Sequence, residues 1–222
     1  MSAVDIDAAA DELLAAYRTG KTLPPLTSTY PGLTVDEAYA IQQRQTVTRS
    51  GAGAGIVGFK IGLTSAAMQQ QLGVDQPDYG HLFTDMLHAA DTPIPTSAFL
   101  QPRAEPEIAL VLAQPLRGPG LSVADVLSAT AYALPAIEII DSRITDWRIG
   151  LEDTIADNAS SGGLVLGGTP TATCRCWAAS CGATAASSTR GRARRSWARR
   201  CWPRPGWPTR SPPAAWRWPP AT

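Results

Sequence analysis

Two strongly apolar segments that carry glutamates constrain the fold of this chain more than any other feature. Glu105 and Glu107 precede the apolar run of residues 108–112, and Glu138 lies inside the apolar run of residues 134–140. Runs of this length and composition predict buried β-strands. A carboxylate within a buried strand is costly unless it is paired with a cation or binds a metal. The sequence therefore predicts two strands whose acidic side chains have a specific partner.

The three glutamates have the chemistry of a divalent-cation site. Side chains alternate along a strand, so Glu105 and Glu107 are expected on one face, roughly 7 Å apart along the backbone. The sequence offers no obvious set of basic partners, and carboxylate oxygens are the ligands that Mg²⁺ and Mn²⁺ prefer. The alternative for each glutamate is an edge position with its side chain in solvent. Glu138 fits that alternative least, since apolar residues flank it on both sides.

The net charge of zero over 222 residues arises from two segments of opposite charge. Residues 1–170 contain all 19 acidic residues but only nine basic ones, and so carry a net charge of −10. Residues 171–222 contain ten arginines, no acid, all four cysteines and six of the seven tryptophans. They also lack Leu, Ile, Val, Met and Phe, which are residues that build cores. We therefore expect a folded body followed by a disordered tail.

The composition of the tail is typical of GC-rich DNA translated in the wrong reading frame. We interpret it as the product of a frameshift near residues 168–172. The alternative is a basic, aromatic tail that binds nucleic acid through phosphate attraction and base stacking. The spacing of the four cysteines does not match paired zinc knuckles, so we expect no metal in the tail.

Helix signals precede strand signals along the body. Residues 5–19 have the spacing of an amphipathic helix, and Thr34 with Glu37 predicts a capping box at the start of a second helix. Strand-like sequence begins at residues 56–64 and recurs in the glutamate-bearing segments. Two helices followed mostly by strands predict an α+β fold. The predicted organisation is an N-terminal helical region (1–55), a metal-binding catalytic β domain (56–170) and the aberrant tail (171–222).

Five segments of the body resemble the 2-keto-4-pentenoate hydratases in order and spacing. These enzymes belong to the hydratase/decarboxylase branch of the fumarylacetoacetate hydrolase superfamily, and the resemblance covers about residues 5–170. Five separate motifs make a chance agreement implausible. The segments are GFKIGLT (58–64), LGVDQPDYG (72–80), LQPRAEPE (100–107), PAIEIIDSRI (135–144) and DTIADNAS (153–160).

The resemblance implies a mixed β roll or sandwich with N-terminal helices, truncated at its C-terminus. It implies Mg²⁺ or Mn²⁺ held by Glu105, Glu107 and Glu138, where the cation stabilises the enolate of a 2-oxo acid. The implied enzyme is a hydro-lyase of aromatic catabolism, which hydrates 2-hydroxypenta-2,4-dienoate to 4-hydroxy-2-oxopentanoate. Two activities of the same branch remain open, 4-oxalocrotonate decarboxylase and 2-oxohept-4-ene-dioate hydratase. An inactive, aggregation-prone frameshift product, which lacks the strands that close the roll, also remains open.

Four further residues are candidates for proton transfer and substrate binding. Lys60 lies in an apolar strand and is expected to act as an acid–base group, with Asp78 in a turn-rich loop as its partner. The alternatives are a surface lysine and an aspartate that only forms a turn. Arg103 and Ser160 are expected to hold the substrate carboxylate, and an ion pair with a nearby glutamate is the alternative for Arg103.

The composition also indicates where the protein is located and which partners it binds. The body contains no cysteine for a disulfide framework, and the N-terminus lacks the regions of a signal peptide. No apolar run approaches the roughly 20 residues of a membrane helix. We therefore expect a cytoplasmic homo-oligomer that binds a small molecule but neither membrane nor nucleic acid. The only two histidines, His81 and His88, are predicted to be loop residues.

Overall fold

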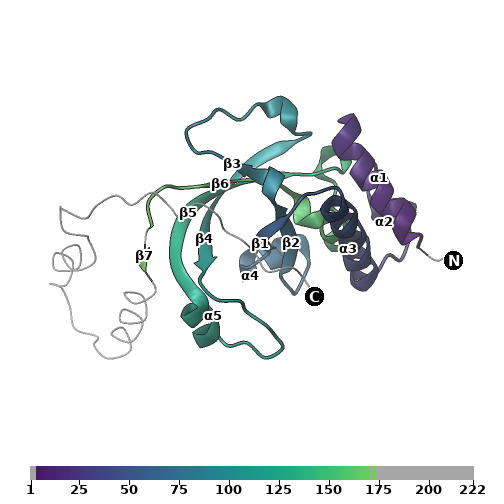
Figure 1. Ribbon diagram of the computed structural model, residues 1–222. Helices are drawn as coiled ribbons and strands as arrows, with labels where there is room; N and C mark the ends of the chain where they lie inside the picture. The colour runs from purple at the N-terminus through teal and green to yellow at the C-terminus, as the bar shows by residue number, and fades with distance from the viewer. Residues whose placement is uncertain (1–3, 171, 174–222) are drawn as a thin grey trace. The chain divides into compact units, whose positions relative to one another are not determined.

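A computed structural model describes residues 4–170, 172 and 173, and the structural statements below refer to these residues. They form a mixture of helices and sheets, as the sequence predicts (Figure 1). The predicted tail, residues 171–222, lies outside the described residues apart from 172 and 173. The helices are α1 (Ile6–Thr19), α2 (Leu26–Thr29), α3 (Val35–Gly51), α4 (Ala66–Leu72), α5 (Val123–Ala129) and α6 (Leu151–Ala156), with 3₁₀ turns η1 (Thr84–Met86), η2 (Thr96–Ala98), η3 (Thr145–Trp147) and η4 (Asn158–Ser160). The strands are β1 (Ile56–Gly62), β2 (Asp78–Phe83), β3 (Leu87–His88), β4 (Pro102–Leu112), β5 (Thr130–Asp141), β6 (Ser161–Leu166) and β7 (Ala172–Thr173).

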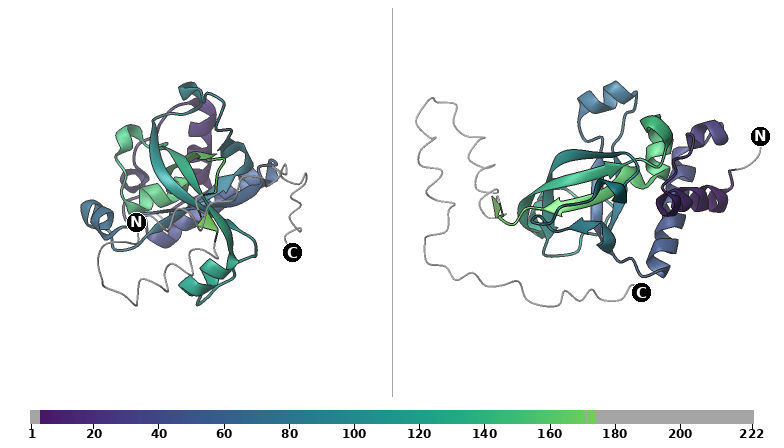
Figure 2. Two further views of the ribbon diagram at one scale, coloured as in Figure 1. Left: turned by 90° about the vertical axis from the view of Figure 1, so that its left-hand side faces the viewer. Right: turned by 90° about the horizontal axis from the view of Figure 1, so that it is seen from above.

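The N-terminal helices gather with α6 at one side of the sheets (Figures 1 and 2). The helix starts predicted from the sequence are present: Asp5 caps α1 by accepting a hydrogen bond from the Ala8 N–H at 2.9 Å, and Thr34 and Glu37 form a capping box on α3. These contacts satisfy N–H groups that a helix start otherwise leaves unpaired. None of the described helices is long and apolar enough to cross a membrane. The aliphatic core of this region includes Leu13, Leu26, Leu33, Ile41 and Ile155.

The strands β1 to β6 form two sheets. β1 and β2 pair antiparallel, and the larger sheet follows the order β3-β6-β5-β4. In the larger sheet the long strands β4 and β5 run antiparallel, β5 is antiparallel to β6, and β3 is parallel to β6. The strands predicted around the glutamates are therefore present, and Glu105 of β4 pairs directly with Glu138 of β5. The predicted burial is wrong for β4, whose residues are exposed or half-buried.

The loop predicted for Asp78, His81 and His88 is wrong. Asp78 begins β2, His81 lies within it, and His88 ends the short strand β3. Residues 78–83 pair with β1 although turn-forming residues precede them, because long-range pairing and burial outweigh local preference. His81 is 7% exposed, and its Nδ1 lies 3.3 Å from the hydroxyl of Thr46.

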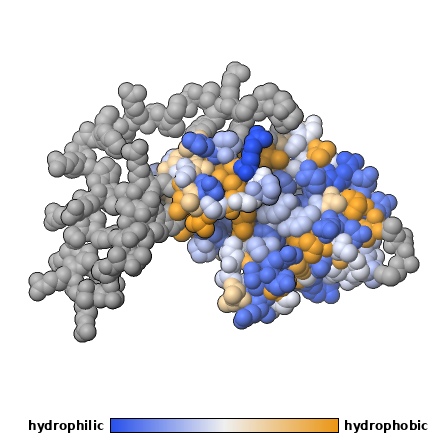
Figure 3. Space-filling view, turned by 90° about the horizontal axis from the view of Figure 1, so that it is seen from below, coloured by the Kyte–Doolittle hydropathy of each residue, from blue (hydrophilic) through white to orange (hydrophobic). Residues whose placement is uncertain are grey.

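One face of the β4–β5 pair exposes apolar side chains. Ile108, Leu110 and Leu112 of β4 and Ile137 of β5 are each at least 41% exposed. They lie on the face opposite to that of the glutamates, because side chains alternate along each strand. Figure 3 shows apolar side chains that reach the surface among polar ones. The β4–β5 pair therefore carries the three glutamates on one face and exposed aliphatic side chains on the other.

Candidate functional site

The β4–β5 register brings the three glutamates together. Glu105 and Glu138 face each other across the strand pair, and Glu107 is two residues further along the same face of β4. Each offers a carboxylate oxygen within 4.8 Å of the other two. Glu138 is buried, Glu105 is half-buried and Glu107 is exposed, so the cluster opens toward solvent at one side. This spacing is compatible with three oxygen ligands around one divalent cation.

Glu138 is the carboxylate whose environment most favours a bound cation. Burial raises the pKa of Glu138 above its usual range, and the charges of Glu105 and Glu107 add to that rise, while Lys60 opposes it. Its Oε1 is buried and accepts no hydrogen bond, although the Lys60 Nζ lies 3.4 Å away. A buried carboxylate oxygen without a donor is unusual, and a metal ion at this point would satisfy it. The residues present therefore fit a divalent metal.

Lys60 links the carboxylate cluster to the smaller sheet. Its side chain, on β1, is 11% exposed, so it does not extend to the surface as the alternative interpretation supposed. The ammonium donates a hydrogen bond to the carbonyl of Ala159 at 3.1 Å and forms the ion pair with Glu138. The amine is thus held at the edge of the cluster, where it can exchange a proton with a bound molecule.

Asp78 lies beside Lys60 on the neighbouring strand. The β1–β2 register pairs Gly62 with Asp78 and Lys60 with Gly80. Asp78 is 4% exposed, and burial raises the pKa of its carboxyl above the usual range although Lys60 opposes the shift. Its Oδ1 accepts no hydrogen bond. A methyl group on Gly62 would lie 2.2 Å from that oxygen, so only a glycine leaves room for Asp78 here.

Ser160 ends the 3₁₀ turn η4, which lies next to Lys60. The side chain of Ser160 is buried, and its Oγ lies 3.5 Å from the hydroxyl of Thr154. Residues 158, 159 and 160 all have positive φ, between 50° and 54°, a conformation that non-glycine residues seldom adopt. The strain indicates that the surrounding contacts hold this turn in place.

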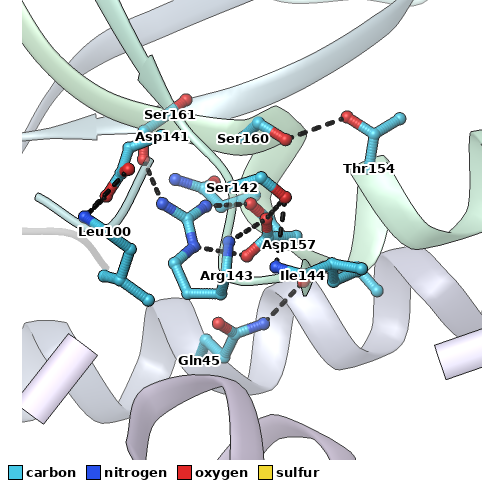
Figure 4. Close-up of polar contacts among 12 residues, drawn as sticks. Gln45, Leu100, Asp141, Ser142, Arg143, Ile144, Thr154, Asp157, Ser160 and Ser161 are labelled. Carbon is cyan, nitrogen blue, oxygen red and sulfur yellow. Dashed lines mark hydrogen bonds and ion pairs between the residues drawn. The ribbon is translucent and has the colours of Figure 1, made fainter. Parts of the chain in front are cut away.

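A buried ion pair that the sequence analysis did not single out holds the two ends of η4. Arg143 and Asp157 are both fully buried and form an ion pair (Figure 4). The guanidinium also donates to the carbonyls of Asp157 and Ser161, which flank the turn. Burial raises the pKa of Asp157 to about 6, against the opposing effect of Arg143. Arg143 and Asp157 both lie in segments that resemble the hydratase family, 135–144 and 153–160, but nothing local in the sequence pairs them.

Arg103 does not join the cluster through an ion pair. In the described residues its guanidinium lies over the ring of Trp147, 4.2 Å from the ring centroid, which is a cation–π contact. The alternative of an ion pair with a neighbouring glutamate is therefore wrong for this conformation. Arg103 is exposed and precedes Glu105 by two positions on β4, so it lies at the solvent side of the site.

Comparison with known proteins identifies close relatives of the body. No family model matches the chain. The chain is 51% identical over 161 residues to a 2-keto-4-pentenoate hydratase of Burkholderia vietnamiensis. The matched residues make up 72% of this chain and 62% of the relative. It is 48% identical over 158 residues to a 2-hydroxypent-2,4-dienoate hydratase of Pseudomonas putida, which covers 71% of each chain. The matched segment spans about 60% of the length of several curated relatives.

A solved structure has a similar fold. The chain matches 4-oxalocrotonate decarboxylase from Pseudomonas putida G7, complexed with magnesium and adipate, with a TM-score of 0.73 and 33% sequence identity. This match covers 77% of the present chain and 64% of the decarboxylase. The same decarboxylase complexed with calcium and acetate matches with a TM-score of 0.72.

Proposed function

The chain belongs to the 2-keto-4-pentenoate hydratase family, and on that premise we propose that it is a divalent-metal-dependent hydro-lyase. Its substrate is 2-hydroxypenta-2,4-dienoate, its product is 4-hydroxy-2-oxopentanoate, and its place is the catabolism of aromatic compounds. The observation that supports this proposal most is the convergence of three carboxylates beside a largely buried lysine. Hydration of a dienoate requires both enolate stabilisation and proton transfer, and this arrangement offers groups for each.

Glu105, Glu107 and Glu138 are the proposed metal ligands. Mg²⁺ is the preferred cation because the decarboxylase of similar fold was solved with magnesium, and Mn²⁺ suits the same oxygen ligands. A bound divalent cation would supply Lewis-acid stabilisation of the negative charge that develops on the substrate's C2 oxygen. The protein's contribution is to hold Glu138 buried beside Glu105 and Glu107, with the Lys60 ammonium 3.4 Å from its Oε1.

Lys60 and Asp78 are the proposed proton carriers. Two proton transfers to carbon are needed: one at C5, which converts the dienol to a conjugated 2-oxo acid, and one at C3, after the oxygen of water has added at C4. Lys60 can donate from its position beside the carboxylate cluster. Asp78 has a raised pKa and a free oxygen, which suits a group that accepts a proton from water. Arg103 and Ser160 remain the proposed contacts for the substrate carboxylate.

A 4-oxalocrotonate decarboxylase is the second candidate, because the solved structures of similar fold have that activity. A 2-oxohept-4-ene-dioate hydratase is the related third. Both substrates carry a distal carboxylate that needs a further cation, and in the described site Arg103 is the exposed candidate. The hydratase is preferred, because the relatives of higher sequence identity are hydratases.

Four further expectations complete the proposal. The fold is a mixed β roll of the fumarylacetoacetate hydrolase type, which the similarity to the decarboxylase structure supports. The enzyme is cytoplasmic, as its cysteine-free acidic body suggests, and homo-oligomeric, as the exposed aliphatic face of β4 and β5 suggests. The regions 1–55, 56–170 and 171–222 are its helical, catalytic and aberrant parts.

The proposal is tested by separating metal binding from turnover in the full-length chain. Glu138→Gln should weaken Mg²⁺ binding measured by calorimetry, since it removes a charged ligand. Lys60→Ala should leave Mg²⁺ binding in place but lower turnover of 2-hydroxypenta-2,4-dienoate by about 10²-fold or more. Lys21→Ala, which removes an exposed lysine, is the matched control.

The outcomes distinguish the candidates. Faster turnover of 4-oxalocrotonate than of the dienoate would favour the decarboxylase. Mg²⁺ binding without turnover of either substrate would support the inactive frameshift product, whereas unchanged Mg²⁺ affinity in Glu138→Gln would remove the proposed metal site.

A further inference from the structure

The turn η4 is strained at each of its three residues. Asn158, Ala159 and Ser160 have φ values of 54°, 50° and 52°. Asparagine tolerates positive φ because its polar side chain can form local hydrogen bonds, whereas the methyl group of alanine cannot. Consecutive residues in such a conformation persist only where neighbouring groups hold them, and such strain concentrates at functional sites.

The carboxamide of Asn158 attaches the turn to β2. The Asn158 Oδ1 accepts a hydrogen bond from the His81 N–H at 2.7 Å, and the Asn158 Nδ2 donates one to the His81 carbonyl at 2.9 Å. Both hydrogen bonds are buried. The carboxamide therefore pairs with both the N–H and the carbonyl of His81, as the backbone of an adjacent strand would. These two hydrogen bonds fix the position of the turn along β2.

Two other features complete the attachment. Arg143 donates to the carbonyls on either side of the turn, those of Asp157 and Ser161. Gly80 lets the turn approach β2 closely, since a Cβ at this position would lie 2.3 Å from the Asn158 carbonyl oxygen. The turn is therefore held at both ends and through its first side chain, and Gly80 leaves room for it to pack closely on β2.

The attached turn presents one carbonyl to the site. The Ala159 oxygen accepts the hydrogen bond from Lys60 at 3.1 Å, and the same ammonium lies 3.4 Å from Glu138 Oε1. These two contacts restrict the amine to one place beside the carboxylates. If the turn moved, Lys60 would keep its charge attraction to Glu138 but lose the acceptor that sets its direction.

We infer that Asn158 is a positioning residue, which locks the turn η4 onto β2 so that the Ala159 carbonyl holds Lys60 at the carboxylate cluster. This role rests on the proposed function for its chemical purpose, but the geometry is testable without turnover. Asn158 does not touch the reacting atoms in this role and acts through Ala159 and Lys60.

The two lysines of the full-length chain allow a direct test. Both are labelled with an amine-acylating reagent, and the rate at each is measured by peptide mass spectrometry. Exposed Lys21 reports the reagent's intrinsic rate, so the Lys60-to-Lys21 ratio isolates the environment of Lys60. In Asn158→Gly, which tolerates positive φ but lacks the carboxamide, the ratio should rise by about fivefold, as expected for one lost hydrogen bond.

The matched control is Asp146→Gly, which removes an exposed side chain at another residue with positive φ. Its ratio should stay within about twofold of that of the unmodified chain, given that surface changes away from special features have small effects. Asn158→Asp keeps the acceptor for the His81 N–H but loses the donor, and should give an intermediate ratio. It also carries the test if Asn158→Gly does not fold.

The proposal is overturned if the ratio in the folded Asn158 variants equals that of the unmodified chain, or if Asp146→Gly raises it equally. In an active chain, Asn158→Gly should lower kcat while KM and Mg²⁺ affinity change by less than about twofold, because a misplaced proton donor affects the chemical step. An inactive unmodified chain with the expected labelling pattern would count against the proposed function alone.

Discussion

At the scale of single residues, the space that one side chain leaves free decides where another can lie. Gly62 and Asp78 face each other across β1 and β2, and the carboxylate of Asp78 occupies the volume that any larger residue at 62 would need. Because Gly62 has no side chain, Asp78 can lie close to the Lys60 ammonium. A methyl group on Gly62 would lie 3.5 Å from that ammonium. The pairing of acid and amine thus depends on a glycine.

Gly62→Ala should therefore displace Asp78 and lower turnover to a similar extent as Asp78→Asn. We also expect a loss of about 1–3 kcal/mol in the free energy of unfolding, the usual effect of overpacking. Gly58→Ala is the control on the same strand, where the new methyl group would meet only Leu82 at 3.9 Å. Steady-state kinetics and urea unfolding measure both effects, and equal behaviour of the two variants would contradict this account.

At the scale of elements, buried amides join the helices to the strand that carries Asp78. The Gln42 side chain of α3 is 1% exposed and donates at 2.9 Å to two carbonyls, those of Tyr79 in β2 and Ile155 in α6. Gln45, one turn later, donates to the Ala156 carbonyl at 2.7 Å. Helix α3 is therefore connected to the site through backbone acceptors.

Gln42→Leu should destabilise the chain by about 1–3 kcal/mol, because buried carbonyls lose their donor while the volume stays similar. Gln43→Leu changes an exposed neighbour and should have an effect within about 0.5 kcal/mol. Thermal unfolding followed by circular dichroism compares the two. If both variants had the melting temperature of the unmodified chain, the amide contacts of Gln42 would not stabilise the packing of α3 on β2 and α6.

At the scale of the whole molecule, the carboxylate cluster links metal binding to stability and pH. The raised pKa of Glu138 means that the folded, metal-free chain holds its proton more tightly than the unfolded chain does. The metal-free fold therefore loses stability as pH rises from the ordinary glutamate range through the raised pKa. A divalent cation binds the ionised form and offsets this loss.

Mg²⁺ should consequently raise the melting temperature more at about pH 7.5 than at about pH 5, where the proton competes for Glu138. At a hundredfold excess over its Kd, the ion would stabilise the fold by about 2.7 kcal/mol. Calorimetric scans with Mg²⁺ and with chelator at both pH values measure this difference. Glu138→Gln should abolish the pH dependence of the gain, and a gain that is equal at both pH values would contradict the linkage.

Features that depend on neighbouring residues were already determined by the sequence. The caps at Asp5 and Thr34 act over three residues, and the strands around Glu105 and Glu138 follow from continuous apolar runs. The alternation of side chains also placed Glu105 and Glu107 on one face before any partner strand was known.

Features that depend on which distant segments meet were decided only by the tertiary structure. Asp78 and His81 have loop-like sequence surroundings, and pairing with β1 placed them in a buried strand. The Arg143–Asp157 pair and the Asn158 contacts with His81 join segments 14 and 77 residues apart, a distance at which periodicity carries no information. The sequence therefore contained the chemical groups of the site. The register of β4 with β5 and of β1 with β2 determined their arrangement, because strand pairing depends on contacts between segments that are far apart in sequence.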